Sequence, residues 1–149
     1  GIAMFLEAGQ GLDSKNMKPV GAAILNRVIG NNVALEASGS TRRVSISSVM
    51  GEKGQFESLG KFKSALKTGK GAASTYGKGE AVQAMVSDLV KGNVGSNQNA
   101  ETAFYFRRGK MSNETMRTPD GHSFATKYDS GLNYIGNSPL VRHTGSKFK

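Results

Sequence analysis

The strongest helical periodicity in the sequence lies between residues 79 and 91. Apolar side chains recur there at helical spacing before Gly92, at Ala81, Val82, Met85, Val86 and Leu89. Because helical turns bring such positions onto adjoining stripes, the pattern predicts an amphipathic helix that packs against a core. Glycine just after the last periodic position is a common helix terminator. The fold must therefore accommodate at least one core-facing helix.

A second apolar segment extends from Val20 to Ile29 and is followed by Gly30. Asp13 and Ser14 offer helix caps and Pro19 suits a first turn, so we expect Val20 to Ile29 to form an apolar helix that ends at Gly30. Gly21 and the alanines after it would let another helix approach closely. Residues 31–41 are expected to form a loop.

The remaining segments contain fewer periodic apolar positions. Residues 61–78 are rich in Lys, Gly and small side chains, which favours a helical turn followed by a mobile basic loop. Residues 103–106 form an aromatic run that could be a strand or an extended segment beneath a groove, and turn-forming residues dominate 109–123. We predict a mainly α fold with long irregular loops and at most a small β element.

Glu7 occupies an unusual position for an acidic residue. It closes a short apolar run that begins at Ile2 and ends just before a glycine turn at Gly9. The carbonyl end of a helix carries partial negative charge, so Lys or Arg would be more stable in this last turn. Apolar neighbours and the helix end would both raise the pKa of Glu7, which is what a general acid needs near neutral pH. The alternative is an ordinary solvated glutamate.

Composition places the chain among single-domain globular proteins. Its 149 residues, of which 37% are hydrophobic, suffice for one core, so we expect one domain spanning residues 1–149. The sequence begins at Gly1 inside an apolar segment, without an initiator Met, and we expect that an N-terminal segment has been trimmed. The absence of cysteine excludes disulfides, thiol nucleophiles and thiolate metal sites. No apolar run reaches the roughly 20 residues of a transmembrane helix.

The net charge of +9 predicts an anionic environment. Nucleic acid, anionic lipid and an anionic cell-envelope polymer would all be attracted, and charge alone does not choose among them. The basic segments lack the regular aromatic interleaving of single-strand nucleic-acid binders, so we expect no specific nucleic-acid partner. No self-complementary apolar stripe indicates a dimer, and we expect a monomer.

Other catalytic motifs are incomplete. Residues 71–79 resemble a phosphate-binding loop, but they have five residues between the glycines and no Ser or Thr after Lys78. His122 and His143 lack the spacing of a zinc site, and no Gly-x-Ser-x-Gly elbow occurs. We therefore expect no metal and no cofactor.

Five short motifs follow one another along the chain. They are Glu7-Ala8 with the glycine turn after it, Ala22-Ala23-Ile24-Leu25-Asn26-Arg27-Val28, Gln55-Phe56-Glu57-Ser58, Phe104-Tyr105-Phe106, and Gly121-His122-Ser123-Phe124. Together they resemble the SleB-type cell wall hydrolases, named for spore-cortex lytic enzymes. The resemblance covers most of the chain. Its Glu-Ala and Ile-Leu-Asn-Arg-Val pieces are specific, whereas the others are short and individually weak.

The resemblance implies a lysozyme-like fold of the goose-type and lytic transglycosylase kind, acting on the glycan strands of peptidoglycan. The family's catalytic acid falls on Glu7. A second acid that the family often carries four residues later is replaced by Gly11, and the segment after Tyr128 has no counterpart. Size, basic charge and the divergent motif further suggest a bacteriophage lysin, such as the virion-associated enzyme of an enveloped double-stranded RNA phage. Its site of action would be the bacterial cell envelope and periplasm.

A glycosidase normally uses two carboxylates, but only Glu7 has a persuasive setting in this sequence. We therefore expect a lytic transglycosylase in which Glu7 protonates the glycosidic oxygen between N-acetylmuramic acid and N-acetylglucosamine. The same carboxylate would then take the proton of the muramoyl C6 hydroxyl, giving a 1,6-anhydro sugar. If the enzyme hydrolyses instead, Glu57 is the candidate second carboxylate.

Six further residues are candidate substrate contacts. They are Asn26, Gln55, Phe56, Ser58, Tyr105 and His122. Amide and hydroxyl groups could bond the N-acetyl groups of the sugars, and aromatic rings could wall the cleft or stack on a sugar. Each has a structural alternative, since amides and hydroxyls also satisfy turns, rings also fill cores, and a lone His can simply hold a loop.

Two other functions stay open. A peptidoglycan endopeptidase would also suit a phage lysin, although the chain lacks both cysteine and a zinc triad. A non-catalytic basic module would bind nucleic acid or an anionic envelope polymer. Five lysines could serve such binding or could simply form a solvated face, which is the default interpretation, and they are Lys61, Lys63, Lys67, Lys70 and Lys78. Such a module would be indifferent to Glu7, because the loss of one acid should leave polyanion binding intact.

Overall fold

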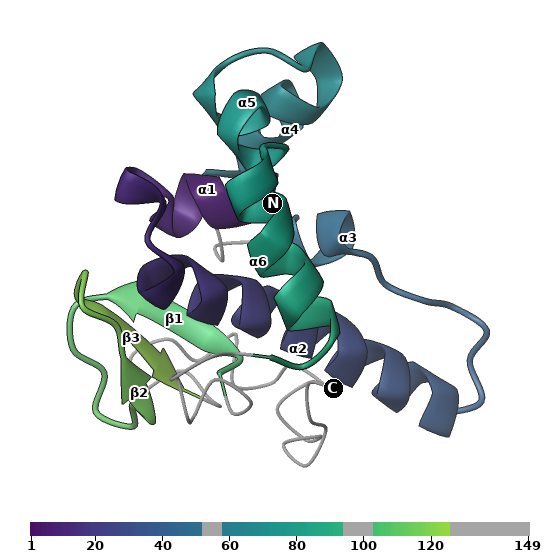
Figure 1. Ribbon diagram of the computed structural model, residues 1–149. Helices are drawn as coiled ribbons and strands as arrows, with labels where there is room; N and C mark the ends of the chain where they lie inside the picture. Colours follow the sequence, from purple (N-terminus) through teal and green to yellow (C-terminus); the bar gives the residue numbers. More distant parts are fainter. Residues whose placement is uncertain (52–57, 94–102, 126–149) are drawn as a thin grey trace.

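The computed structural model describes residues 1–51, 58–93 and 103–125. These residues are mainly helical and carry a small sheet. The elements are α1 (Ile2–Ala8), η1 (Gln10–Leu12), α2 (Ser14–Ala37), α3 (Ile46–Met50), α4 (Leu59–Thr68), α5 (Ala72–Gly77), α6 (Glu80–Val90), β1 (Tyr105–Arg108), β2 (Met116–Arg117) and β3 (His122–Ala125). Figure 1 shows α1 between α2 and the α4–α5 pair, with the sheet beside α2.

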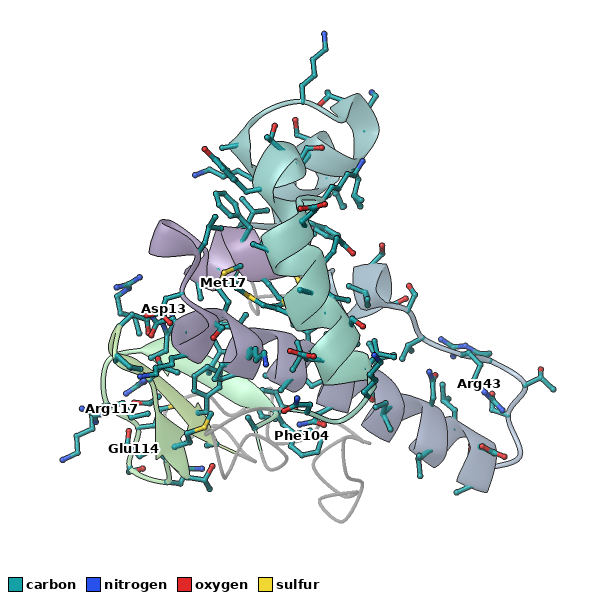
Figure 2. All side chains as sticks on the ribbon, in the orientation of Figure 1. Asp13, Met17, Arg43, Phe104, Glu114 and Arg117 are labelled. Atoms are coloured by element: carbon teal, nitrogen blue, oxygen red, sulfur yellow. The ribbon has the colours of Figure 1, made fainter. Side chains whose placement is uncertain are left out.

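The core lies where α1, α2 and α6 meet. Its buried side chains from these helices include Met4, Met17, Val20, Val82 and Leu89. Figure 2 labels Met17, which is fully buried near the start of α2. The helix predicted over residues 79–91 is confirmed as α6, and its predicted stripe supplies three buried residues.

α2 begins earlier than predicted. Its first residue is Ser14, and the Asp13 carboxylate caps the helix by accepting a hydrogen bond from the Lys15 amide at 2.9 Å. A cap of this kind stabilises a helix end by about 1 kcal/mol. Pro19 lies inside the helix rather than at its first position, and it is buried. Asp13, one of the two residues expected to cap a helix, is thus the observed cap, and it starts the helix ahead of the proline.

α2 also ends later than predicted. It continues through Gly30 to Ala37, so the loop predicted for residues 31–41 is wrong over its first seven residues. The Asn32 side chain accepts a hydrogen bond from the Val44 amide at 2.7 Å and donates one to the Val44 carbonyl at 3.2 Å. These bonds tie the additional turns to the returning chain. They offset the cost of glycine inside a helix, which is about 1 kcal/mol.

The segment predicted as a helical turn and a mobile basic loop contains two helices. α4 buries Phe62 and Ala65 and ends at Gly69, whose φ of 64° is the left-handed conformation that glycine adopts without strain. α5 begins at Ala72 and packs on α1. The loop prediction is therefore wrong for residues 72–77, because contact with α1 rather than local periodicity stabilises this short helix.

Two glycines allow helices to approach each other closely. A Cβ atom at Gly21 would meet Leu89 and Met4, so the close approach predicted for this helix is confirmed. A Cβ atom at Gly77 would lie 2.7 Å from the Cα atom of Ile2. α5 and α1 therefore touch through their backbones.

Gly77→Ala is expected to lower the free energy of unfolding by about 2 kcal/mol, because backbone atoms of Ile2 cannot rotate away from the added carbon. Gly60→Ala is the matched control, since Gly60 lies in α4 and a Cβ atom there meets nothing within 4 Å. It is expected to raise the free energy of unfolding by about 0.5–1 kcal/mol through helix propensity. Denaturant titration followed by circular dichroism measures both. Equal effects of the two substitutions would contradict the backbone contact.

The sheet has the strand order β1–β3–β2, with both pairs antiparallel. Phe106 of β1 pairs with Phe124 of β3, and their ring centres are 5.4 Å apart. The Asp120 amide donates a hydrogen bond to the Asn16 side chain at 3.1 Å, which attaches the turn before β3 to the first turn of α2. Residues 109–123, predicted as turns, thus contain β2 and the start of β3. For residues 103–106, which are expected to form either a strand or an extended segment, β1 confirms a strand that begins at Tyr105.

Candidate functional site

Glu7 and Ser58 meet in the fold although 51 residues separate them in the sequence. The Ser58 hydroxyl donates a hydrogen bond to the Oε1 atom of Glu7. Glu7 lies in the last turn of α1, and Ser58 immediately precedes the first residue of α4. The Ser58 side chain makes no capping bond to α4, so the turn-capping alternative does not describe it. The structure thus joins two of the predicted site residues.

The end of α1 provides little electrostatic support for an acid. The last turn of α1 contains no basic residue, and the Gly9 amide closes the helix by donating to the Phe5 carbonyl at 2.8 Å. A Cβ atom at Gly9 would lie 2.3 Å from that carbonyl oxygen, so the turn requires glycine. The partial negative charge of a helix end disfavours a carboxylate. Glu7, which is partly buried, thus lies where the helix end by itself does not favour an acid.

A hollow of about 360 Å³ opens beside the end of α1. We call it the aromatic hollow, and it is lined by Phe5, Gly9, Gly11, Leu12 and Tyr76. The rings of Phe5 and Tyr76 stack with their centres 5.4 Å apart and their planes at 21°. Tyr76 remains 49% exposed. An exposed ring on an apolar support is a surface on which a sugar can stack.

The backbone that lines the aromatic hollow is strained. Gly11 has a φ of 81°, which glycine tolerates, but Leu12 has a φ of 53°. A leucine in this left-handed region costs about 1–2 kcal/mol. Strain of this size gathers at binding and catalytic sites. The observation therefore adds to the case for a functional site at the end of α1.

Asn26 and Arg27, from the most specific sequence motif, are buried inside the fold. Asn26 is 1% exposed, and its Nδ2 donates a hydrogen bond to the Ala103 carbonyl at 2.8 Å. The guanidinium carbon of Arg27 lies 4.7 Å from the centre of the Tyr105 ring, which is fully buried. These contacts attach α2 to the segment that enters β1. The predicted substrate contacts of Asn26 and Tyr105 are corrected to structural roles, because a sugar cannot reach either side chain.

His122 is buried as well. Its Nδ1 lies 2.9 Å from Oδ1 of Asp120, and its ring packs against Phe106. The predicted contact of His122 with substrate is corrected to the structural alternative, in which it holds the turn before β3. Burial would raise the pKa of Asp120, but hydrogen bonds from Thr118 and His122 and the charge of His122 outweigh it. The pKa of Asp120 therefore lies below its ordinary value.

Asp120→Asn is expected to lower the free energy of unfolding by about 0.5–1 kcal/mol at pH 7. A lowered pKa means that the folded state favours the carboxylate. The stabilisation is then complete above the unfolded-state pKa and is lost as pH falls through the folded-state pKa. The difference between wild type and variant should therefore shrink below about pH 4. Urea titrations at a series of pH values measure it, and a difference that grows on acidification would contradict this role.

Three residues of the predicted site, Gln55, Phe56 and Glu57, lie outside the described residues. Their predicted roles stay predictions. Within the three described ranges, no group of three or more His, Asp or Glu side chains could hold a metal ion.

Phe5 and Tyr76 carry no recognisable motif in the sequence. Phe5 belongs to the apolar run before Glu7, where a core position is the default interpretation. Tyr76 is a lone aromatic residue among Ala, Ser, Thr and Gly. This isolation from other apolar side chains is the sequence feature that could have indicated an exposed ring. The packing of α5 on α1 brings the two rings together, so the aromatic hollow follows from tertiary structure.

No family model, curated protein or solved structure matches the chain. The link to the SleB-type hydrolases therefore rests on the motifs in the sequence. The mainly helical fold with a small sheet is confirmed, whereas the lysozyme-like assignment stays a prediction. In the part of the chain that the structure describes, no helix combines the length and the apolar composition needed to cross a bilayer.

Proposed function

We propose that the chain is a peptidoglycan-degrading lytic enzyme that cleaves the glycosidic bond between N-acetylmuramic acid and N-acetylglucosamine. Its reaction is that of a lytic transglycosylase, with Glu7 as general acid and then general base. The observation that carries the proposal is the hydrogen bond from Ser58 to Glu7 at the end of α1. A partly exposed acid from the first sequence motif is thereby held by the hydroxyl group of the third motif.

The hydrogen bond from Ser58 gives the Glu7 carboxyl group a fixed orientation. Since Ser58 donates to Oε1, we assign the transferable proton to the other carboxyl oxygen, Oε2. Oε2 donates the proton to the glycosidic oxygen as its bond to muramoyl C1 breaks and positive charge develops on C1. The C6 hydroxyl oxygen then bonds to C1 and returns its proton to Oε2. Glu7 is regenerated, and no water is consumed.

The positive charge of the chain fits this site of action. A net charge of +9 attracts the protein to the anionic bacterial envelope, where its glycan substrate lies. We propose that the chain acts there as a monomeric phage lysin, at the envelope or carried in the virion. The mechanism requires neither a metal ion nor a cofactor.

Tyr76→Ala is expected to raise KM for glycan strands by about fivefold, because a sugar stacked on an exposed ring gains of the order of 1 kcal/mol. Tyr76→Phe keeps the ring, loses only the hydroxyl, and should stay within about twofold of wild type. Steady-state kinetics on soluble glycan strands measure both variants. An unchanged KM in the alanine variant would exclude the aromatic hollow as a sugar subsite.

The direct test is whether the chain produces new glycan ends from purified peptidoglycan. The wild-type chain is expected to produce them, and Glu7→Gln is not. Freed peptide ends with intact glycan would favour the endopeptidase. Binding to peptidoglycan without any cleavage would favour the basic module, whose affinity should be unaffected by Glu7→Gln.

A further inference from the structure

Exposed and half-buried apolar side chains gather where α2, α3 and α6 meet. We call them the apolar strip, and they are Leu25, Ile29 and Val33 of α2, Ile46 of α3, and Val86 and Val90 of α6. Leu25, Ile46 and Val86 line one hollow between these helices. The other members of α2 and α6 follow Leu25 and Val86 at intervals of four residues, so they lie on the same helix faces. The apolar strip therefore covers adjoining faces of three helices.

Three members of the apolar strip are open to solvent. Val33 is 42% exposed, Ile46 is 43% exposed and Val90 is 62% exposed. The described residues contain five exposed large hydrophobic side chains, so most of these side chains belong to the apolar strip. Single exposed apolar residues are ordinary, whereas a group of them marks an interaction surface. We therefore expect a partner to cover the apolar strip.

Cationic side chains border the apolar strip. Arg42 and Arg43 lie on the loop between α2 and α3, and Figure 2 shows this loop extending from the body of the molecule. Lys91 directly follows Val90 at the end of α6. All three cations are exposed, and none forms an ion pair with a described residue. The Nη1 atom of Arg43 donates to the carbonyls of Ser40 and Arg42 at 2.9 and 2.7 Å, which positions the guanidinium group without neutralising its charge.

The loop that carries both arginines is held beside the apolar strip. The two hydrogen bonds between the Asn32 side chain and the backbone of Val44 attach this loop to α2, one residue before Val33. Residues 31–51 contain one acidic residue, Glu36, against the two arginines. Positive charge therefore exceeds negative charge beside the apolar strip. A partner with both apolar and anionic groups complements this surface.

Charge and shape distinguish between the candidate partners. A second copy of the chain would bring the same cations against one another, and a net charge of +9 opposes such pairing. A folded protein partner anchors itself with side chains that fill pockets. The hollow in the apolar strip has a volume of about 50 Å³, compared with about 360 Å³ for the aromatic hollow, and offers little room for an anchor. A phospholipid surface needs no pocket, because acyl chains adapt to apolar side chains and phosphates attract Arg and Lys.

We propose that the apolar strip docks the chain onto the surface of an anionic phospholipid bilayer. Val33, Ile46 and Val90 enter the boundary between the headgroups and the acyl chains, while Arg42 and Arg43 bind lipid phosphates. The docked chain lies on the bilayer and does not cross it. This interaction goes beyond the proposed function, because it requires neither the catalytic acid nor a glycan.

Cosedimentation with large unilamellar vesicles tests the docking. One set of vesicles contains phosphatidylcholine mixed with phosphatidylglycerol, and the other contains phosphatidylcholine alone. The wild-type chain is expected to bind the anionic vesicles at physiological salt and to bind the uncharged vesicles at least about tenfold more weakly.

Ile46→Ser is expected to weaken binding to the anionic vesicles by about fivefold, because the apolar side chain that enters the bilayer is lost. Leu66→Ser is the matched control. Leu66 lies in α4, outside the apolar strip, and is 50% exposed, which is close to the exposure of Ile46. Its variant should bind within about twofold of wild type. Circular dichroism melts show whether both variants are folded.

Arg42→Gln/Arg43→Gln tests the cationic border and leaves every member of the apolar strip in place. Its binding to the anionic vesicles is expected to fall by about thirtyfold. Lys63→Gln/Lys67→Gln removes the same charge from exposed positions of α4. It should bind within about twofold of wild type at physiological salt, because salt screens charges that lie far from the bilayer. Glu7→Gln should bind as wild type does.

Equal weakening by Ile46→Ser and Leu66→Ser would overturn the docking surface, and so would equal weakening by the two double variants. Equal binding of the wild-type chain to both kinds of vesicle, or binding to neither, would overturn it as well. Sedimentation velocity without lipid checks the second copy as the partner. A wild-type dimer that Ile46→Ser dissociates would replace the bilayer with that copy. None of these measurements depends on glycan cleavage, so failure of the docking is distinct from failure of the proposed function.

Discussion

Glu7→Gln is expected to lower the rate of glycan cleavage by about a thousandfold, which lies within the range that general acid–base catalysis supplies. Glutamine keeps the shape of the side chain, and its oxygen can still accept the hydrogen bond from Ser58. It cannot donate a proton to the glycosidic oxygen or take one from the C6 hydroxyl. Release of soluble saccharide from purified peptidoglycan measures the rate. A circular dichroism melt shows that the variant is folded.

Glu36→Gln is the control for this substitution. It makes the same chemical change at an exposed position near the end of α2, outside the residues that line the aromatic hollow. Its rate is expected to equal that of wild type. A Glu7→Gln variant with the wild-type rate would eliminate Glu7 as the catalytic group, and glycosidase chemistry would then need another acid.

Arg27→Ala is expected to have the largest effect on stability, lowering the free energy of unfolding by about 3 kcal/mol. The Arg27 side chain is 2% exposed, and its guanidinium group lies over the buried ring of Tyr105. Truncation leaves a cavity and removes the cation that packs on this ring. Because a whole domain is stabilised by only about 5–15 kcal/mol, the loss should be visible as a much lower denaturation midpoint.

Arg42→Ala is the matched control for this loss. Arg42 is exposed and precedes Arg43, which Figure 2 labels on the loop between α2 and α3. The substitution removes the same charge and is expected to change the free energy of unfolding by less than about 0.5 kcal/mol. If both variants unfold at the same denaturant concentration, Arg27 does not hold α2 against β1.

Helices whose apolar side chains recur at helical spacing within the helix itself could be predicted from the sequence. α6 shows its core positions over several turns, and Gly21 in an apolar helix predicts the close approach that Leu89 and Met4 make. α5 could not be predicted, because six residues of Ala, Ser, Thr, Tyr and Gly have no helical stripe of their own. The last turns of α2 likewise depend on the bonds between Asn32 and Val44.

In the candidate site, too, local features could be predicted from the sequence, whereas contacts made by tertiary packing could not. Glu7 could be predicted because a carboxylate at a helix end is locally unfavourable and therefore noticeable in the sequence. Its bond with Ser58 could not be derived from spacing, since only the packing of α4 on α1 brings the two side chains together. Asn26 and Tyr105 show the opposite error. Polar groups in a specific motif suggested substrate contacts, whereas they hold the inside of the fold.

The most direct test of the central claim is to digest purified peptidoglycan in water enriched in oxygen-18 and to analyse the soluble products by mass spectrometry. Intramolecular attack by the C6 hydroxyl consumes no water, so the account predicts 1,6-anhydromuramic acid ends that carry no oxygen-18. These products should be absent when Glu7→Gln replaces the wild-type chain. Oxygen-18 at a reducing sugar end, or at a newly formed peptide carboxyl group, would contradict the account.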